Sequence, residues 1–330
     1  MKHKKINKEV IMKKQKLYLV CILVIGVIVS GCAPSMRVPV TRPAEINLRG
    51  INKIAIGEIS GNCGQEMYDL LTSKLFESGK FDVLDRANLD KIMKEHNLTL
   101  GGAVDEKTAA KMGELVGAAS LVFGNVSLCK YEEKKTVGIP WTDKDGGYHK
   151  AHYVTGTAKI TVTFKVVGMQ TGKILAAKTI SKEATDYNSA DNRWPESPNG
   201  DAIKDTARNG TIAAFMKMIS PYTEYVSVTF AENDSKVPEM AQGVNYAKKG
   251  MWNEALENFK TATQKNPAHA GAWFNLGLAY EYTSMFKEAE AAFNEANKIK
   301  PCDECMNEIA NTRLLAAERK KLEEQGVIAK

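Results

Sequence analysis

The sequence has little net charge outside its first segment, and this limits what the protein can bind. The chain carries 45 Lys and Arg against 39 Asp and Glu, but residues 1–31 hold seven of the lysines and one of the acids, so the other 299 residues carry 38 of each sign. A protein that binds a nucleic-acid backbone needs a clear excess of positive charge. We therefore exclude nucleic acid as a partner. With 44% apolar and 25% charged residues, the 330-residue chain is typical of a globular protein of about two domains.

The sequence also lacks the short motifs of common catalytic sites. It contains no G-x-S-x-G, no H-E-x-x-H and no Gly-Lys-Ser/Thr. Asp143-Lys144-Asp145-Gly146 begins like a calcium loop, but Val154 stands where that loop requires a bidentate Glu, so we expect a hairpin turn. His149 and His152 would point to opposite faces of an extended strand, which argues against a joint metal site. We expect no catalytic residue, no cofactor and no metal.

The longest hydrophobic run is too short to span a membrane comfortably. It has 13 residues, Leu17 to Val29, where a spanning helix needs roughly 20. It follows a lysine-rich stretch and leads into Val29-Ser30-Gly31-Cys32, the plan of an export signal. These four residues resemble a bacterial lipobox, which implies cleavage before Cys32 and acylation of that cysteine. An uncleaved anchor or a plain secretory signal is the alternative, and the start is Met1 or Met12.

The residue after the cysteine bears on the compartment. Ala33, rather than an acidic residue, follows Cys32, and this is similar to lipoproteins that are sent to the outer membrane. Residues 1–31 are therefore expected to be a signal peptide. We expect the mature protein to be held by its acyl chains on the periplasmic face of the outer membrane.

Four further cysteines would lie in a compartment that permits disulfides. Cys63 and Cys129 can pair only if their segments meet, which the sequence does not decide. Cys302-Asp303-Glu304-Cys305 resembles a redox or zinc half-site, but it has no βαβ context, no second pair and no following histidine. We interpret it as a structural disulfide or as two idle thiols.

Strands and helices alternate after an expected tether, residues 32–49. Hydrophobic periodicity predicts strands over residues 51–59, 81–86, 119–128 and 224–230, and helices over residues 65–78, 87–96, 105–116 and 202–219. Such an order predicts a domain of the α/β or α+β class over residues 50–231, with helices packed against a sheet.

Four motifs follow one another within this region. They are Asp82-Val83-Leu84-Asp85-Arg86-Ala87-Asn88-Leu89, Leu98-Thr99-Leu100-Gly101-Gly102, residues 112–126, and residues 164–175 with a Thr171-Gly172 turn. Together they resemble the periplasmic domain of the curli secretion lipoproteins, the CsgG family, which lies near the amino-terminal domain of the TolB translocation protein. The resemblance implies an α/β sandwich, a role in curli or envelope assembly or secretion, and possible association with copies of the same chain. It supplies no catalytic residues.

Two segments depart from the pore-forming members of that family, whose membrane-spanning strands need about 9 to 11 residues of apolar alternation. Residues 129–155 are rich in charge, and residues 182–201 contain almost nothing apolar except Tyr187 and Trp194. We therefore expect two protein-contacting loops, with Trp141 and Trp194 as aromatic anchors. An oligomeric secretion pore is the alternative function, and an activator of a cell-wall enzyme is a third.

A 34-residue periodicity begins after the polar linker 232–236. Gly243, Tyr246, Ala255, Phe259, Ala262 and Pro267 recur as Gly277, Tyr280, Ala289, Phe293, Ala296 and Pro301, and Trp273 and Leu276 complete the second set. This is the pattern of the tetratricopeptide repeat. It predicts an all-α domain over residues 237–325, with repeats 236–269 and 270–303 and a capping helix from about residue 304 to 324.

The first helix of each repeat lines a groove in such domains, and residues between the core positions are candidates for binding. They are Asn245, Lys248, Lys249, Asn275 and Glu281. A solvated helix face is the alternative. Taken together, the sequence predicts a non-enzymatic, lipid-anchored protein that binds envelope proteins or peptides through its repeats.

Overall fold

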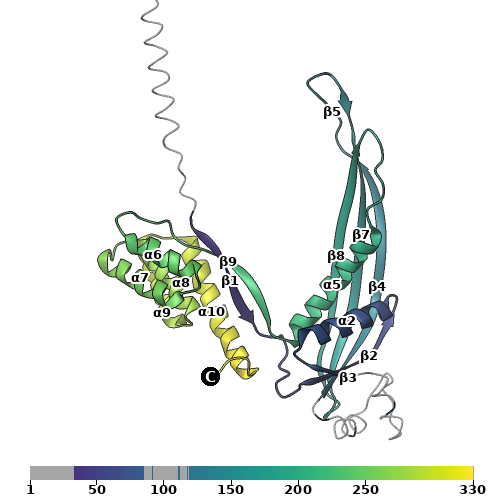
Figure 1. Ribbon diagram of the computed structural model, residues 1–330, viewed down its shortest axis with the longest axis horizontal. Helices are drawn as coiled ribbons and strands as arrows, with labels where there is room; N and C mark the ends of the chain where they lie inside the picture. The colour runs from purple at the N-terminus through teal and green to yellow at the C-terminus, as the bar shows by residue number, and fades with distance from the viewer. Residues whose placement is uncertain (1–32, 85–90, 92–110, 112–116, 118, 330) are drawn as a thin grey trace, which may run out of the picture. The chain divides into compact units, whose positions relative to one another are not determined.

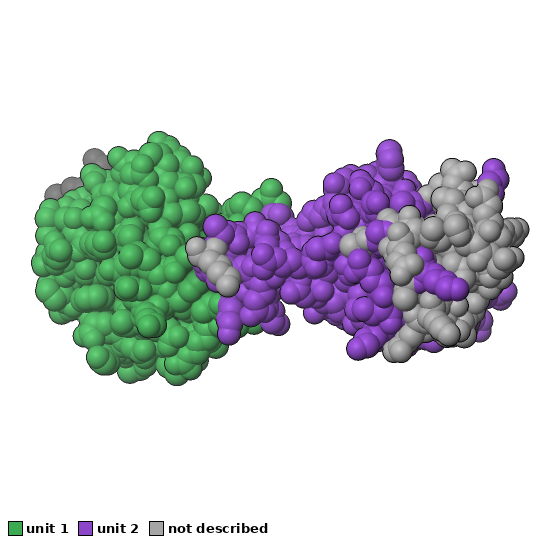
Figure 2. Space-filling view, turned by 90° about the horizontal axis from the view of Figure 1, so that it is seen from below, with its two compact units in different colours: residues 1–40, 225–317 green, residues 41–224, 318–330 purple. Residues whose placement is uncertain are grey.

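The computed structural model describes residues 33–84, 91, 111, 117 and 119–329, which fall into two compact units (Figure 2). The repeat unit comprises residues 1–40 and 225–317, and the α/β unit comprises residues 41–224 and 318–330. Cys32 and the helices expected over residues 87–96 and 105–116 lie outside the described residues, apart from single positions.

The α/β unit is built on a five-stranded sheet in the order β3-β2-β4-β7-β8. Its strands are β2 (Lys53–Gly61), β3 (Asp82–Leu84), β4 (Ala119–Val137), β7 (Ala151–Gly168) and β8 (Ile174–Asp191). β2 pairs in parallel with β3 and β4, whereas β4, β7 and β8 form an antiparallel meander. The expected Thr171-Gly172 turn joins β7 to β8, with Gly172 at a φ of 66° and its N–H donating to Gly168 O at 2.9 Å.

One face of this sheet is covered by α2 (Gly64–Ser78) and α5 (Gly200–Ile219), as Figure 1 shows. The alternation along β7 explains the arrangement, because its inward side chains are apolar and buried while the outward ones are Thr and Lys. Phe164 of β7 meets Phe215 of α5 with ring centroids 4.4 Å apart. A disulfide between Cys63 and Cys129 ties the start of α2 to β4. The α/β class predicted from the alternation is confirmed.

The segments expected as loops, residues 129–155 and 182–201, are largely strand. β4 and β7 stay paired from Lys130 opposite Lys159 to Val137 opposite His152, and β8 stays paired with β7 out to Asp191. The expectation was wrong because it read charge as a sign of loops. Cross-strand hydrogen bonds satisfy the backbone whatever the side chains are, and charged side chains on both faces suit strands that project into water.

We call this projecting part the arm. It consists of residues 130–137, 151–158 and 184–191, with a small hairpin, β5 (Trp141–Thr142) and β6 (Tyr148–His149), at its far end. Figure 1 shows the three long strands continuing past the amino-terminal end of α5 to the β5 hairpin. Asp143 to Gly147 form the β5–β6 turn, so the hairpin turn expected in place of a calcium loop is confirmed.

The repeat unit contains two helix pairs and a long final helix. The pairs are α6 (Pro238–Lys248) with α7 (Trp252–Lys265) and α8 (Ala270–Tyr282) with α9 (Phe286–Ile299), and the final helix is α10 (Asp303–Glu324), of which residues 303–317 belong to this unit. Each pair lies within one of the two 34-residue repeats, 236–269 and 270–303.

The repeated small and aromatic residues make the same contact in both pairs. A Cβ added at Gly243 would lie 2.5 Å from the Phe259 ring, and one at Gly277 would lie 2.6 Å from the Phe293 ring, so only glycine allows this approach. The remaining core alanines and Leu276 are buried, whereas Tyr246, Trp273 and Tyr280 are partly exposed and Pro267 and Pro301 are exposed at the ends of the second helices.

A two-stranded sheet, β1 (Ser35–Arg42) with β9 (Tyr222–Thr229), accompanies the repeats. The expected tether over residues 32–49 therefore contains a regular strand. Its apolar residues explain this, since Val38 of β1 is buried together with Val228 and Phe230 in the cluster that contains Val244 and Leu278 of the repeat helices. Part of the inner surface of the repeats is thus covered by the chain itself.

Candidate functional site

The hairpin at the end of the arm gathers exposed apolar side chains. Ile139 is 90% exposed, Tyr148 61% and Trp141 55%. Large apolar side chains that are grouped and exposed mark interaction sites more often than single ones do. We call residues 138–150 the tip.

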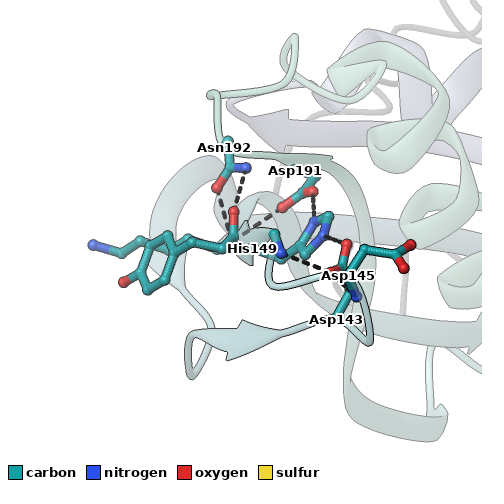
Figure 3. A network of polar contacts seen from close by, with 8 residues as sticks. Asp143, Asp145, His149, Asp191 and Asn192 are labelled. Carbon is teal, nitrogen blue, oxygen red and sulfur yellow. Dashed lines mark hydrogen bonds and ion pairs between the residues drawn. The ribbon is translucent and has the colours of Figure 1, made fainter.

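A histidine and two aspartates hold the tip to the end of β8, as Figure 3 shows. His149 Nε2 lies 2.9 Å from Asp143 Oδ2, and His149 Nδ1 contacts Asp191 Oδ2. Asp143 Oδ1 accepts from the N–H of Gly147 at 2.7 Å and of Asp145 at 3.0 Å. The Trp141 ring stacks on His149 with centroids 4.3 Å apart. Trp141 is therefore held in a defined orientation while more than half of it stays exposed.

Each charged group of this network shifts the pKa of its neighbours toward their charged form. The hydrogen bonds that the imidazole of His149 donates to Asp143 and then to Asp191 raise the pKa of His149 above its usual value. The pKa of Asp143 is lowered, first by its hydrogen bond with His149 and then by the one from the N–H of Gly147. The pKa of Asp191 is also lowered, and its hydrogen bond with His149 is again the largest cause. The two carboxylates thus favour the protonated form of the imidazole relative to a free histidine.

The raised pKa predicts a pH dependence of tip order. The contribution of His149 is present below its ordinary pKa of about 6.5 and is lost as pH rises through the raised pKa of the folded state. The contribution of the aspartates is lost only at acidic pH, below their lowered values. We expect the hydrogen-exchange protection of the Lys150 amide, which donates to Asp191 and Asn192, to fall as the pH rises above the ordinary histidine pKa of about 6.5 and through the raised pKa of His149. The variant His149→Gln should not show this pH dependence. The control variant His269→Gln, changed in the repeat unit, should still show it. An unchanged pH profile in His149→Gln would refute the assignment.

The second expected anchor, Trp194, lies in the segment that leads from β8 to α5. Its ring meets His152 edge to face at 4.8 Å, and Lys135 Nζ lies 5.6 Å from its centroid. Trp194 is 45% exposed. Trp141 therefore lies in the hairpin at the end of the arm and Trp194 packs against the arm, and each contacts a histidine while it stays partly exposed.

Two of the residues expected in the repeat groove are instead buried. Asn275 is fully buried and its Oδ1 accepts from Ala231 N at 2.8 Å. Glu281 is 3% exposed and accepts from Thr312 Oγ1 at 2.6 Å and Asn311 Nδ2 at 3.1 Å. This placement does not fit a role in partner binding for either side chain, because both are engaged within the unit.

The other three, Asn245, Lys248 and Lys249, are exposed on α6 and at its end. They stay candidates for contact with a partner.

Sequence reasoning missed the roles of Asp143, His149 and Asp191. The only signal was an Asp-rich turn two residues before a histidine, and nothing along the chain indicates that Asp191 pairs across the arm. Among the described residues, no three His, Cys, Asp or Glu side chains are grouped as metal ligands would be, and no helix is long and apolar enough to cross a membrane.

Comparison with known proteins bears on both units. The sequence model described as curli production assembly/transport component CsgG matches residues 50–246, more than half of the chain, and a model of the tetratricopeptide repeat matches residues 243–282. No curated protein matches the chain in sequence.

Several solved structures are similar to parts of the chain. The PelC dodecamer of Paraburkholderia phytofirmans is 14% identical, covers 57% of this chain and 99% of its own, and has a TM-score of 0.27. Lipoprotein GNA1162 of Neisseria meningitidis is 11% identical with coverage of 49% and 96% and a TM-score of 0.29. The LpoB carboxy-terminal domain of Salmonella enterica is 12% identical with coverage of 40% and 83% and a TM-score of 0.27. At these scores none of the likenesses bears on function.

Proposed function

The chain belongs to the family of curli production assembly/transport components, and on this premise we propose that it is a non-enzymatic lipoprotein of the outer membrane. In this proposal it lies on the periplasmic face, anchored at Cys32, and takes part in envelope assembly or secretion by binding other proteins. The tip of the arm is the principal contact, and the exposed face of α6 is a second one.

The main support for the proposal is the charge on both faces of the arm. Glu132 and Glu133 are neighbours in β4 and stand opposite Thr157 and Gly156 of β7, so their side chains lie on opposite faces of the sheet. Lys134 and Lys135 repeat this arrangement at the next two positions. Both faces of the arm therefore carry charge, and neither is an apolar surface that lipid could cover. A Lys facing lipid at the bilayer midplane costs about 2 to 4 kcal/mol, and the cost recurs in every copy of the chain.

The length of the strands favours the alternative, an oligomeric secretion pore. β4 has 19 residues and β7 has 18, more than the roughly 9 to 11 that a spanning strand needs. Length alone is not sufficient, because the outward positions of such strands must also be apolar. In the arm these positions hold Lys130, Glu132 and Lys134 on one face and Glu133 and Lys135 on the other.

The tip supplies what binding requires. Trp141, Tyr148 and Ile139 offer apolar area, and ring stacking and hydrogen bonds already hold Trp141 in place. A side chain that is ordered before binding loses little conformational entropy on association, so rigid aromatic residues are effective anchors.

Site-specific photocrosslinking in intact cells tests the proposal. A photoreactive amino acid in place of Ile139 should give a discrete crosslinked product with another protein, and Trp141→Ala in the same chain should reduce its yield at least tenfold. The same photoreactive amino acid in place of Lys165, an exposed position of β7 in the body of the sheet, is the matched control and should give no such product.

Sizing of the detergent-extracted product separates the two functions. A complex of few chains that contains a second protein is expected. A large ring made only of this chain, crosslinked to itself from position 139, would contradict the proposal and favour the pore.

A further inference from the structure

The second disulfide, Cys302–Cys305, lies at the beginning of α10. The two Cα atoms are 5.5 Å apart and only two residues separate the cysteines. Cys302 directly precedes the first residue of the helix and is partly exposed, whereas Cys305 is 1% exposed. Cys302, at the helix terminus, is thus the more exposed of the two cysteines.

This disulfide forms part of the wall of a cavity within the repeat unit. The cavity has a volume of about 600 Å³, and its lining includes both cysteines, Phe274, Glu304 and Glu308. A peptide segment that entered it would meet a wall that includes both cysteines and Phe274. The disulfide therefore borders a recess large enough for part of a peptide, and it is not enclosed between packed helices on all sides.

Two features of the helix terminus would stabilise a thiolate on Cys302 once the disulfide is opened. The backbone N–H of Cys305 donates to Cys302 Sγ at 3.2 Å, and the first turn of a helix carries partial positive charge. Both effects favour a sulfur anion at this position and make Cys302 a good leaving group in thiol exchange.

The short loop also sets this disulfide apart from Cys63–Cys129. A disulfide stabilises a fold chiefly by restricting the unfolded chain, and the effect grows with the length of the closed loop. Cys63 and Cys129 are 66 positions apart and pack against the core of the α/β unit, while Cys302 and Cys305 are three apart. Opening the shorter loop costs the fold little.

The charge of the cavity indicates which segments it would accept. Its lining carries three carboxylates, Glu232, Glu304 and Glu308, against the single ammonium of Lys300. Burial raises the pKa of Glu308 above its usual value and so favours its uncharged form, although a hydrogen bond from Asn311 acts in the opposite direction; the excess of negative charge therefore rests mainly on Glu232 and Glu304. A basic segment would compensate the excess of negative charge.

We propose that Cys302–Cys305 is a thiol–disulfide exchange site whose substrate is a pair of thiols in a basic segment of a partner protein. A substrate thiolate attacks Cys302 Sγ, the bond to Cys305 Sγ breaks, and Cys305 leaves with the electron pair and takes up a proton. The second substrate thiolate then attacks the substrate sulfur of the mixed disulfide and displaces Cys302. The substrate dithiol loses two electrons and two protons and becomes a disulfide, while Cys302 and Cys305 become a dithiol, so one round needs no other oxidant.

Exchange with two matched peptides tests the proposal on the full chain. Both peptides contain the same pair of cysteines, flanked by lysines in one and by glutamates in the other. Alkylation of free thiols followed by mass spectrometry should show that the lysine peptide reduces Cys302–Cys305 at least tenfold faster than the glutamate peptide does. Cys63–Cys129, in the same molecules, should stay oxidised. Equal rates with the two peptides, or reduction of both disulfides together, would overturn the proposal.

Two single variants identify the attacked sulfur. Cys305→Ala leaves Cys302 as a free thiol, which should form a mixed disulfide with the oxidised lysine peptide. Cys302→Ala leaves the buried Cys305, which should form at least tenfold less. Circular dichroism of each variant checks that the helices are retained. If a variant does not fold, the experiment with the two peptides on the unaltered chain still tests the proposal. Equal trapping at the two positions would contradict the assignment of Cys302.

Discussion

Replacement of Cys32 by Ala is expected to abolish acylation and to leave the protein at its precursor size. The lipobox proposed for residues 29–32 would need the cysteine thiol, because acylation of that thiol precedes cleavage of the signal. Each buried CH₂ of an acyl chain contributes about 0.8 kcal/mol to membrane binding, so several chains together give a firm anchor. Labelling with a fatty acid and gel mobility measure both effects, and Ser35→Ala is the matched control that should retain acylation. A membrane-bound mature protein of normal size from Cys32→Ala would contradict the anchor.

Replacement of Phe164 by Ala is expected to lower the free energy of unfolding of the α/β unit by about 3 to 5 kcal/mol, the usual cost of removing a buried aromatic side chain. Phe164 is fully buried and packs on Phe215, so truncation leaves a cavity between the sheet and α5. Urea unfolding followed by circular dichroism measures the change.

The neighbouring residue on the opposite face provides the control for this change. Thr163 points outward, where its hydroxyl pairs with that of Thr179 at 2.8 Å. Thr163→Ala should therefore cost below about 1 kcal/mol. Equal losses in the two variants would show that the covered face of the sheet has been assigned wrongly.

The parts of the fold that repeat along the chain could be predicted from the sequence. The repeat helices could be predicted because the same glycine–phenylalanine pair occurs twice, 34 positions apart. Gly243 allows Phe259 to approach closely, and Gly277 does the same for Phe293. The sheet core follows from the strict alternation of β7.

The parts that were missed depend on contacts between distant segments. The sequence of the arm predicts a loop because it has no apolar face. Its strands are stabilised instead by backbone pairing across the sheet, for example of Lys134 with Thr155. Asn275 and Glu281 occupy polar positions of a helix, yet the N–H of Ala231 donates a hydrogen bond to Asn275 and the hydroxyl of Thr312 donates one to Glu281. Asp191 reaches His149 over 42 positions. Periodicity along one segment contains none of this information.

The central claim is that this member of the family binds partners with its arm and does not itself conduct. Electrical recording across a planar bilayer to which the purified, acylated full chain has been added tests this most directly. We predict a conductance no different from that of the bilayer alone, because Glu132, Glu133, Lys134 and Lys135 charge both faces of the arm. Discrete, protein-dependent channels that disappear when residues 138–150 are replaced by an Asn-Gly turn would contradict it.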